Sequence, residues 1–303
     1  MGEKVALTLS APVTYLRQTI WPAGLSAFYP TNASVSWIEL CLGAALLAAI
    51  AGVCVAWFLR RRSPVLSLLA FAVAWGYVSL LPMLGIVKVG DQPHSDRYTY
   101  WVGCGLAAVA AMAVCRYAGK FEKQAMRVQA GVLGALVLAT WMRMPVWKDA
   151  FSLYADAAPK SWAAQPVCVL SRYLRMRGED GERQAEAMLR TALTQTHYRE
   201  IRAEFAHLLA CRARKSGFGL GDGEPAFEEA RYEAESVLAA NPAHALANEA
   251  LAIVEMKEGK WASAARRLEV ARATSDDPSR VDGELAVCRE RLSAGKKESD
   301  VQR

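Results

Sequence analysis

One segment of the chain, residues 88–100, gathers side chains of the types that carry out chemistry. Its candidate residues are Lys88, Asp91, His94, Asp96, Arg97 and Tyr98. The cations Lys88 and Arg97 could hold a phosphate of a lipid-linked donor, because both side chains form charge-assisted hydrogen bonds with phosphate oxygens. Asp91, His94 or Asp96 would then serve as an acid, a base or a metal ligand. We therefore predict a substrate-binding segment, without assigning a catalytic group.

The same segment also has a purely structural interpretation. Tyr98, Tyr100 and Trp101 are aromatic residues of the kind that anchor a helix at the membrane interface. Asp96 can form a local ion pair with Arg97, which contributes little at an exposed position. Both interpretations require a membrane helix directly after the segment.

Four hydrophobic runs in the first half of the chain predict such helices. A bilayer core about 30 Å thick needs about 20 helical residues to cross it. The runs are Leu40–Leu59, Ser63–Val87, Tyr98–Cys115 and Val128–Met142. The fourth run is the shortest, and it extends past Arg143 only if that side chain reaches back to the interface. The content of hydrophobic residues, 53% of 303, is high for a fully soluble protein and is concentrated before residue 145.

Basic residues between the runs predict the orientation, because short loops rich in Lys and Arg stay in the cytoplasm. Arg60, Arg61 and Arg62 join the first two runs, and a second basic loop over residues 116–127 joins the last two. These two clusters account for much of the formal net charge of +6, so we expect no nucleic-acid partner. We predict an integral protein of a bacterial inner membrane, with residues 88–97 and the second half of the chain on the extracytoplasmic side.

A repeated spacing in the second half predicts an α-solenoid of the tetratricopeptide type. The four copies are Trp147, Ala150, Tyr154 and Ala157; Ala185, Leu189 and Ala192; Ala230, Ala234 and Val237; and Trp261, Ala264, Leu268 and Ala271. The small residues Ala150, Ala185, Ala230 and Ala264 are 35, 45 and 34 residues apart, against a period of about 34 residues. Glycines between residues 217 and 223 account for the long step. Small residues allow two helices to approach closely, while larger apolar ones fill the gap to the next hairpin.

These patterns together predict an all-α protein in which a transmembrane helical bundle of about four spans precedes a tetratricopeptide-repeat α-solenoid. The predicted parts are an interfacial segment over residues 1–36, a transmembrane region over 37–146, a repeat domain over 147–295 and a polar tail over 296–303. Trp21-Pro22 and Phe28-Tyr29-Pro30 suit an interfacial helix and a turn at the level of the lipid headgroups. A loosely ordered tail is the alternative for this first part.

The cysteines and the remaining histidines predict neither a metal nor another cofactor. The seven cysteines form no CxxC pair and do not alternate with histidine at the spacing of metal ligands. We interpret them as buried, inert thiols. His197, His207 and His244 are spread over the predicted repeat helices, and we interpret them as packing or surface residues.

Several short sequences resemble a known family. They are Trp21-Pro22-Ala23-Gly24-Leu25, Phe28-Tyr29-Pro30, Leu81-Pro82-Met83-Leu84-Gly85-Ile86-Val87, Val89-Gly90, Asp96-Arg97-Tyr98-Thr99-Tyr100 and Trp147-Lys148-Asp149. In this order they resemble the last membrane section of bacterial multispan tetratricopeptide-repeat proteins. Those proteins are similar to the transmembrane and tetratricopeptide repeat-containing O-mannosyltransferases, which have the C-type glycosyltransferase fold. The resemblance implies that Asp96, Arg97 and Tyr98 belong to a wall that faces a polyprenyl phosphate sugar.

The chain departs from that family at its start. Family members begin with several more spans and carry their catalytic acids in the first extracytoplasmic loop, so no catalytic acid is carried over to this chain. Asp91 also stands where members more often have an uncharged residue. We expect either the C-terminal part of a longer enzyme or a shortened homologue that binds without catalysing.

Two functions follow from these patterns. The first is a membrane-anchored tetratricopeptide-repeat protein that binds a protein or polypeptide partner on the extracytoplasmic face, because concave repeat surfaces bind extended peptides. The alternative is the C-terminal part of a glycosyltransferase that moves a sugar from a polyprenyl phosphate donor to protein. A transporter or channel is less favoured, since the predicted spans carry few charges of the kind that line an ion path. The chain alone is not predicted to be an enzyme.

Overall fold

The computed structural model describes residues 10–18, 24–29, 36–59, 64–80, 99–117, 122–215 and 223–301. Within these ranges the chain is helical and contains no strand, which confirms the predicted all-α class. The chain divides into two compact units, Met1–Ala163 and Ala164–Arg303. Each unit is described by itself below.

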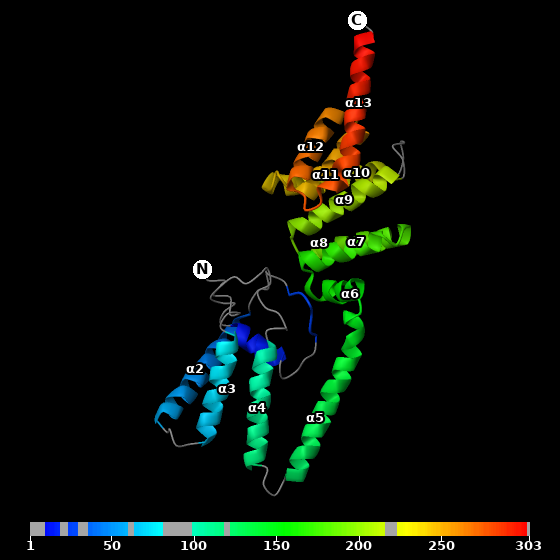
Figure 1. The fold of residues 1–303 in the computed structure, drawn as a ribbon. Coiled ribbons are helices and arrows are strands. Elements are labelled where there is room, and N and C mark those ends of the chain that lie inside the picture. Colours follow the sequence, from blue (N-terminus) through cyan, green and yellow to red (C-terminus); the bar gives the residue numbers. More distant parts are fainter. Residues whose placement is uncertain are drawn as a thin grey trace. The chain divides into compact units, whose positions relative to one another are not determined.

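The first unit contains the helices with the highest content of apolar residues. They are α2 (Trp37–Leu59), α3 (Pro64–Leu80), α4 (Thr99–Tyr117) and α5 (Glu122–Arg143), followed by the 3-10 turn η4 (Met144–Trp147) and helix α6 (Ala150–Ser161) (Figure 1). A further helical segment covers residues 10–18. Helix α3 packs between α2 and α4. A Cβ atom at Gly105 of α4 would collide with the ring of Trp75 on α3, so the close approach of these two helices requires glycine.

Capping residues mark the N-termini of two of these helices. Before α2, the Glu39 N–H donates to Ser36 Oγ at 3.2 Å and the Ser36 N–H donates to Glu39 Oε2 at 3.0 Å. This reciprocal capping box satisfies two backbone donors that the helix cannot pair by itself. Before α6, Asp149 is the N-cap and accepts from the Ser152 N–H at 2.7 Å.

Two stretches of the first unit are long and apolar enough to cross a membrane, Trp37–Leu59 and Lys123–Trp147. The core helix of a soluble protein can have the same composition, but it would be mostly buried. Of the most apolar window, 6% is buried in the first stretch and 0% in the second, so neither stretch is a buried core helix among the described residues. They match the first and the fourth predicted runs. The described part of α3 has 17 residues and the third run overlaps the shorter apolar helix Val102–Met112, so the count of four spans stays a prediction.

The second unit is a stack of helical hairpins. Its helices are α7 (Ala164–Arg175), α8 (Glu179–Gln195), α9 (Arg199–Lys215), α10 (Gly223–Ala240), α11 (Ala245–Lys257), α12 (Trp261–Thr274) and α13 (Asp282–Val301), with the 3-10 turn η5 (Pro278–Val281) before α13 (Figure 1). Each helix packs against the next one along the chain, and α9 also packs against both α7 and α11. Helices α7, α9 and α11 therefore form one layer of the stack. Gly259, with φ of +73°, makes the tight turn between α11 and α12.

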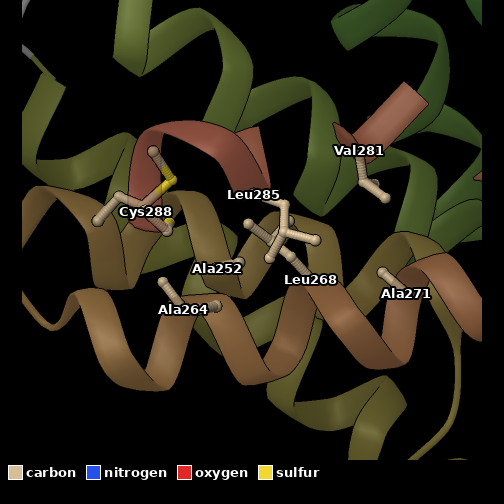
Figure 2. Packing of buried hydrophobic residues seen from close by; sticks show 9 residues of the cluster. Ala252, Ala264, Leu268, Ala271, Val281, Leu285 and Cys288 are labelled. Carbon is tan, nitrogen blue, oxygen red and sulfur yellow. The ribbon is translucent and has the colours of Figure 1, made fainter. Parts of the chain in front are cut away.

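The residues that repeat in the sequence form the core of this unit. In the last three copies every position except the partly buried Trp261 is 0% exposed: Ala185, Leu189 and Ala192 on α8, Ala230, Ala234 and Val237 on α10, and Ala264, Leu268 and Ala271 on α12. In the last copy they pack in one cluster with Ala252 of α11 and with Leu285 and Cys288 of α13 (Figure 2). The alanines let the helix backbones approach, and the leucines and valines fill the space between hairpins.

The first copy of the repeat lies on the other side of the division between the units. Helix α6 belongs to the unit Met1–Ala163, although the predicted repeat domain started at residue 147. Its Ala157 is fully buried, whereas Trp147 and Ala150 are exposed. This copy therefore packs differently from the three that follow.

Candidate functional site

The residues predicted to bind a substrate, Lys88, Asp91, His94, Asp96, Arg97 and Tyr98, lie outside the described residues. Their role stays a prediction. The structure also shows a charged pocket in the second unit, at residues for which the sequence analysis predicts no binding role.

This pocket has a volume of about 340 Å³. Its charged lining residues are Arg172, Arg175, Glu182, Glu204, Lys215 and Arg280. The histidine at position 207 completes the polar wall, and Met176 and Leu246 form an apolar part. Since these residues come from α7, α8, α9, α11, η5 and the turn after α7, the pocket spans successive hairpins rather than one helix.

The most buried charge at the pocket is the carboxylate of Glu204, which is 1% exposed. Arg172 donates to its Oε2 atom through both Nε and Nη2, each at 3.1 Å. Arg175 donates through Nη1 to Oε1 at 3.4 Å. The two arginines are three residues apart on α7, so their side chains lie on one face of that helix and reach one position of α9. Two guanidinium groups thus compensate the cost of burying one carboxylate.

A second buried group of side chains continues from Arg175. Its Nη1 atom lies 3.2 Å from Nδ1 of His207, and Nε2 of His207 lies 2.9 Å from Oε1 of Glu249. Oε2 of Glu249 forms an ion pair with Nη2 of Arg280 at 2.6 Å. Cys211 lies one turn after His207 on α9, with its Sγ atom 3.4 Å from Nε2. The buried Glu249 carboxylate therefore lies between His207 of α9 and Arg280 of η5.

Charge and burial shift the pKa values of this group in opposite directions. Burial lowers the pKa of His207, but Cys211 and Glu249 raise it to about 10, while the Arg175 guanidinium beside Nδ1 opposes protonation there. Burial raises the pKa of Glu249, and His207 and Arg280 together bring it below its ordinary value. Burial likewise raises the pKa of Cys211, and His207 brings it below its ordinary value. The Glu249 carboxylate is therefore ionised at neutral pH.

Acids and bases occupy different depths at the pocket. The side chains of Glu182, Glu204 and Glu249 are 11%, 1% and 3% exposed. Those of Arg172 and Lys215 are 53% and 66% exposed. Arg175 pairs with Glu204, Lys215 with Glu182 and Arg280 with Glu249. Together with Arg172, these side chains make four cations against three carboxylates. A ligand that enters from solvent meets positive charge first.

A separate charged cluster joins α5 to α6 in the first unit. Asp156 accepts from Arg143 Nη1 at 2.7 Å and Nη2 at 2.6 Å, and Lys160 Nζ donates to its two oxygens at 2.7 and 2.9 Å. Arg143 Nη2 also donates to the Leu25 carbonyl oxygen at 2.6 Å. Burial raises the pKa of Asp156, but Arg143 and Lys160 lower it below its ordinary value. Arg143 directly follows the fourth predicted run, and this cluster supplies its guanidinium group with partners from the protein.

Two features of the sequence point to the pocket. Arg172 and Arg175 place two cations on one face of α7, and His207 and Cys211 are four residues apart on α9. Interpreting His207 as a packing or surface residue missed its contacts with Arg175 and Glu249. Those contacts join residues 32 and 42 positions apart, and local spacing does not reveal such pairs.

Chemically, the pocket is suited to binding rather than to nucleophilic catalysis. In a catalytic relay, the nucleophile and the carboxylate that orients the histidine contact opposite ring nitrogens. Here Cys211 and Glu249 both lie beside Nε2 of His207, so the relay geometry is not formed. Comparisons of this chain with protein-family models, with curated proteins and with solved structures found no match.

Proposed function

We propose that this protein is a membrane-anchored α-solenoid of tetratricopeptide-type hairpins that binds an extended polypeptide on the extracytoplasmic side. The observation that carries the proposal is the charged pocket, whose lining residues come from the successive helices α7, α9 and α11. Stacked hairpins present one continuous surface to a ligand, and an extended chain can contact several hairpins at once. A pocket within such a surface fixes the register of the bound chain.

The packing of the second unit supports the tetratricopeptide assignment. Three copies of the repeated spacing recur on α8, α10 and α12, each beginning with a small residue, and all nine of these positions are fully buried. The copies therefore have the same role in successive hairpins, as a repeat array requires. Asn241-Pro242 follows α10, where a repeat of this type should end.

Membrane anchoring is supported by α2 and the stretch Lys123–Trp147, whose apolar windows are almost entirely unburied. The extracytoplasmic orientation rests on the basic residues between the hydrophobic runs. The alternative of a glycosyltransferase depends on residues 88–98, which lie outside the described residues.

Site-specific photo-crosslinking in intact cells tests the binding function. Met176 lines the pocket and is 81% exposed, so we would replace it with benzoylphenylalanine in the full chain. Tyr232 of α10 is 68% exposed and is not among the lining residues, so the same replacement there is the matched control. We expect adducts with extracytoplasmic polypeptides from position 176 and few from position 232. Equal yields at the two positions, or no adduct at 176, would contradict the proposal.

A further inference from the structure

We infer that the charged pocket binds a carboxylate group of the polypeptide, supplied by an acidic side chain or by the C-terminus of that chain. This inference rests on the proposed function and adds the chemistry of recognition. It follows from the depth of the charges, from the donors of the arginines and from the way in which those arginines are held.

The depth of the charges selects an anion over a cation. The carboxylates of Glu204 and Glu249 are almost completely covered by protein, so a cationic ligand could not reach them. Arg172 and Lys215, in contrast, are more than half exposed. A ligand carboxylate would approach these cations without displacing the buried acids.

The arginines also keep donors for a ligand. Among the described residues, Arg172 uses Nε and Nη2 for Glu204, and Arg175 uses Nη1 for Glu204 and His207. Nη1 of Arg172 and Nη2 of Arg175 are then left for a further acceptor. Planar guanidinium groups bind carboxylates through paired N–H donors, which gives direction as well as attraction.

The buried network holds these cations in place before a ligand arrives. Arg175 lies between Glu204 and His207, and Arg280 is held by Glu249. Side chains that are already ordered lose less conformational freedom on binding, so more of the interaction energy is kept as affinity. Met176 and Leu246 add apolar surface beside the charges. A volume of about 340 Å³ admits one or two side chains of an extended chain but no folded domain.

Fluorescence anisotropy with the full chain in detergent tests this inference. Four labelled decapeptides of one sequence would carry either three Glu or three Gln residues, and either a free or an amidated C-terminus. The first variant is Arg172→Gln. The matched control is Arg289→Gln on α13, which removes an exposed arginine that pairs with Glu269 at 3.3 Å outside the pocket. Thermal melting of both variants confirms that they are folded.

We expect the wild type to bind a peptide that offers a carboxylate about tenfold more tightly than the neutral, amidated peptide, and Arg172→Gln to remove most of this preference. Arg172→Lys, which keeps the charge but loses the paired donors, should retain part of it. Preference for the Glu peptides identifies an acidic side chain as the ligand, and preference for the free C-terminus identifies the terminal carboxylate.

Equal affinity of the wild type for all four peptides would overturn the inference but leave the proposed function intact, because a polypeptide would still bind. An equal loss in Arg172→Gln and Arg289→Gln would also overturn it, since the effect would then be general electrostatics. Absence of any peptide binding overturns it as well, and crosslinking at position 176 then judges the proposed function independently.

Discussion

Two buried glutamates determine how charge is arranged in the second unit. A buried carboxylate costs several kcal/mol unless cations and hydrogen bonds compensate it. Glu204 and Glu249 meet this requirement with Arg172, Arg175, His207 and Arg280. The same contacts that make burial tolerable orient the guanidinium groups around the pocket, so stability and the proposed binding depend on the same residues.

Glu249 should make the stability of the array depend on pH. Its folded-state pKa lies below the ordinary value of 4.5, so its contribution is present above pH 4.5 and is lost as pH falls through the folded-state pKa. We expect Glu249→Gln to destabilise the protein at pH 7 by up to about 3 kcal/mol and to reduce the further loss of stability on acidification. Thermal melting of the full chain by circular dichroism between pH 7 and pH 3 measures both effects.

Glu269→Gln on α12 is the matched control for this prediction, because Glu269 is more than half exposed and pairs only with the exposed Arg289 among the described residues. It should change the melting temperature little at either pH. An acid-induced loss in Glu249→Gln as large as in the wild type would contradict the role assigned to Glu249.

Cys211 should be the most reactive thiol of the second unit. His207 brings its pKa below the ordinary value and it is partly exposed, whereas burial raises the pKa values of Cys168 and Cys288, which are both buried. Because the thiolate is the reacting form, we expect iodoacetamide at pH 7.5 to modify Cys211 about tenfold faster than either of the others. Mass spectrometry of timed samples measures the three rates. His207→Gln should slow the reaction at Cys211, and a rate that does not change would show that His207 does not activate the thiol.

At the scale of elements, the helices of the second unit are positioned by small residues on one face of every second helix. Ala264 is 0% exposed and lies in the cluster of buried residues from α11, α12 and α13 (Figure 2). We expect Ala264→Leu to destabilise the protein by about 1–3 kcal/mol through overpacking. The melting temperature of the full chain, followed by circular dichroism, measures this loss.

Ala262→Leu is the matched control for Ala264→Leu, because Ala262 is exposed on the same helix and leucine is nearly as favourable as alanine within a helix. It should leave the melting temperature almost unchanged. If both substitutions had the same effect, the repeated alanines would not be the contacts that set the spacing of the helices.

These elements also show how far the sequence predicts the structure. Periodic positions such as Ala230, Ala234 and Val237 were predictable as packing contacts, because helical periodicity and the repeat interval both mark them. The pairing of Arg172 with Glu204 was not predictable, since it depends on which faces of α7 and α9 meet. Arg143 is recognisable in the sequence as the charge that ends the fourth hydrophobic run. Its partner Asp156 was not predictable, because it lies beyond the turn η4 and sequence periodicity does not reveal the direction in which a turn leads the chain.

At the scale of the whole molecule, the two units differ in how they satisfy their apolar residues. The second unit buries its own core, with nine repeat positions at 0% exposure. In the first unit, the apolar windows of α2 and of Lys123–Trp147 are 6% and 0% buried. Apolar surface of this extent is costly in water. The chain thus combines a helical array that buries its own core with two stretches that are long and apolar enough to cross a membrane.

The most direct test of this account is the location of the C-terminus, because the array can meet an extracytoplasmic polypeptide only if it lies on that side of the membrane. Two reporters would be fused in turn after Arg303 of the full chain in a bacterial host. Alkaline phosphatase is active only outside the cytoplasm, whereas green fluorescent protein fluoresces in the cytoplasm but not after export in an unfolded state. The account predicts an active phosphatase and a dark fluorescent protein, both in the membrane fraction. An inactive phosphatase with a bright fluorescent protein would place the array in the cytoplasm and contradict the proposed function.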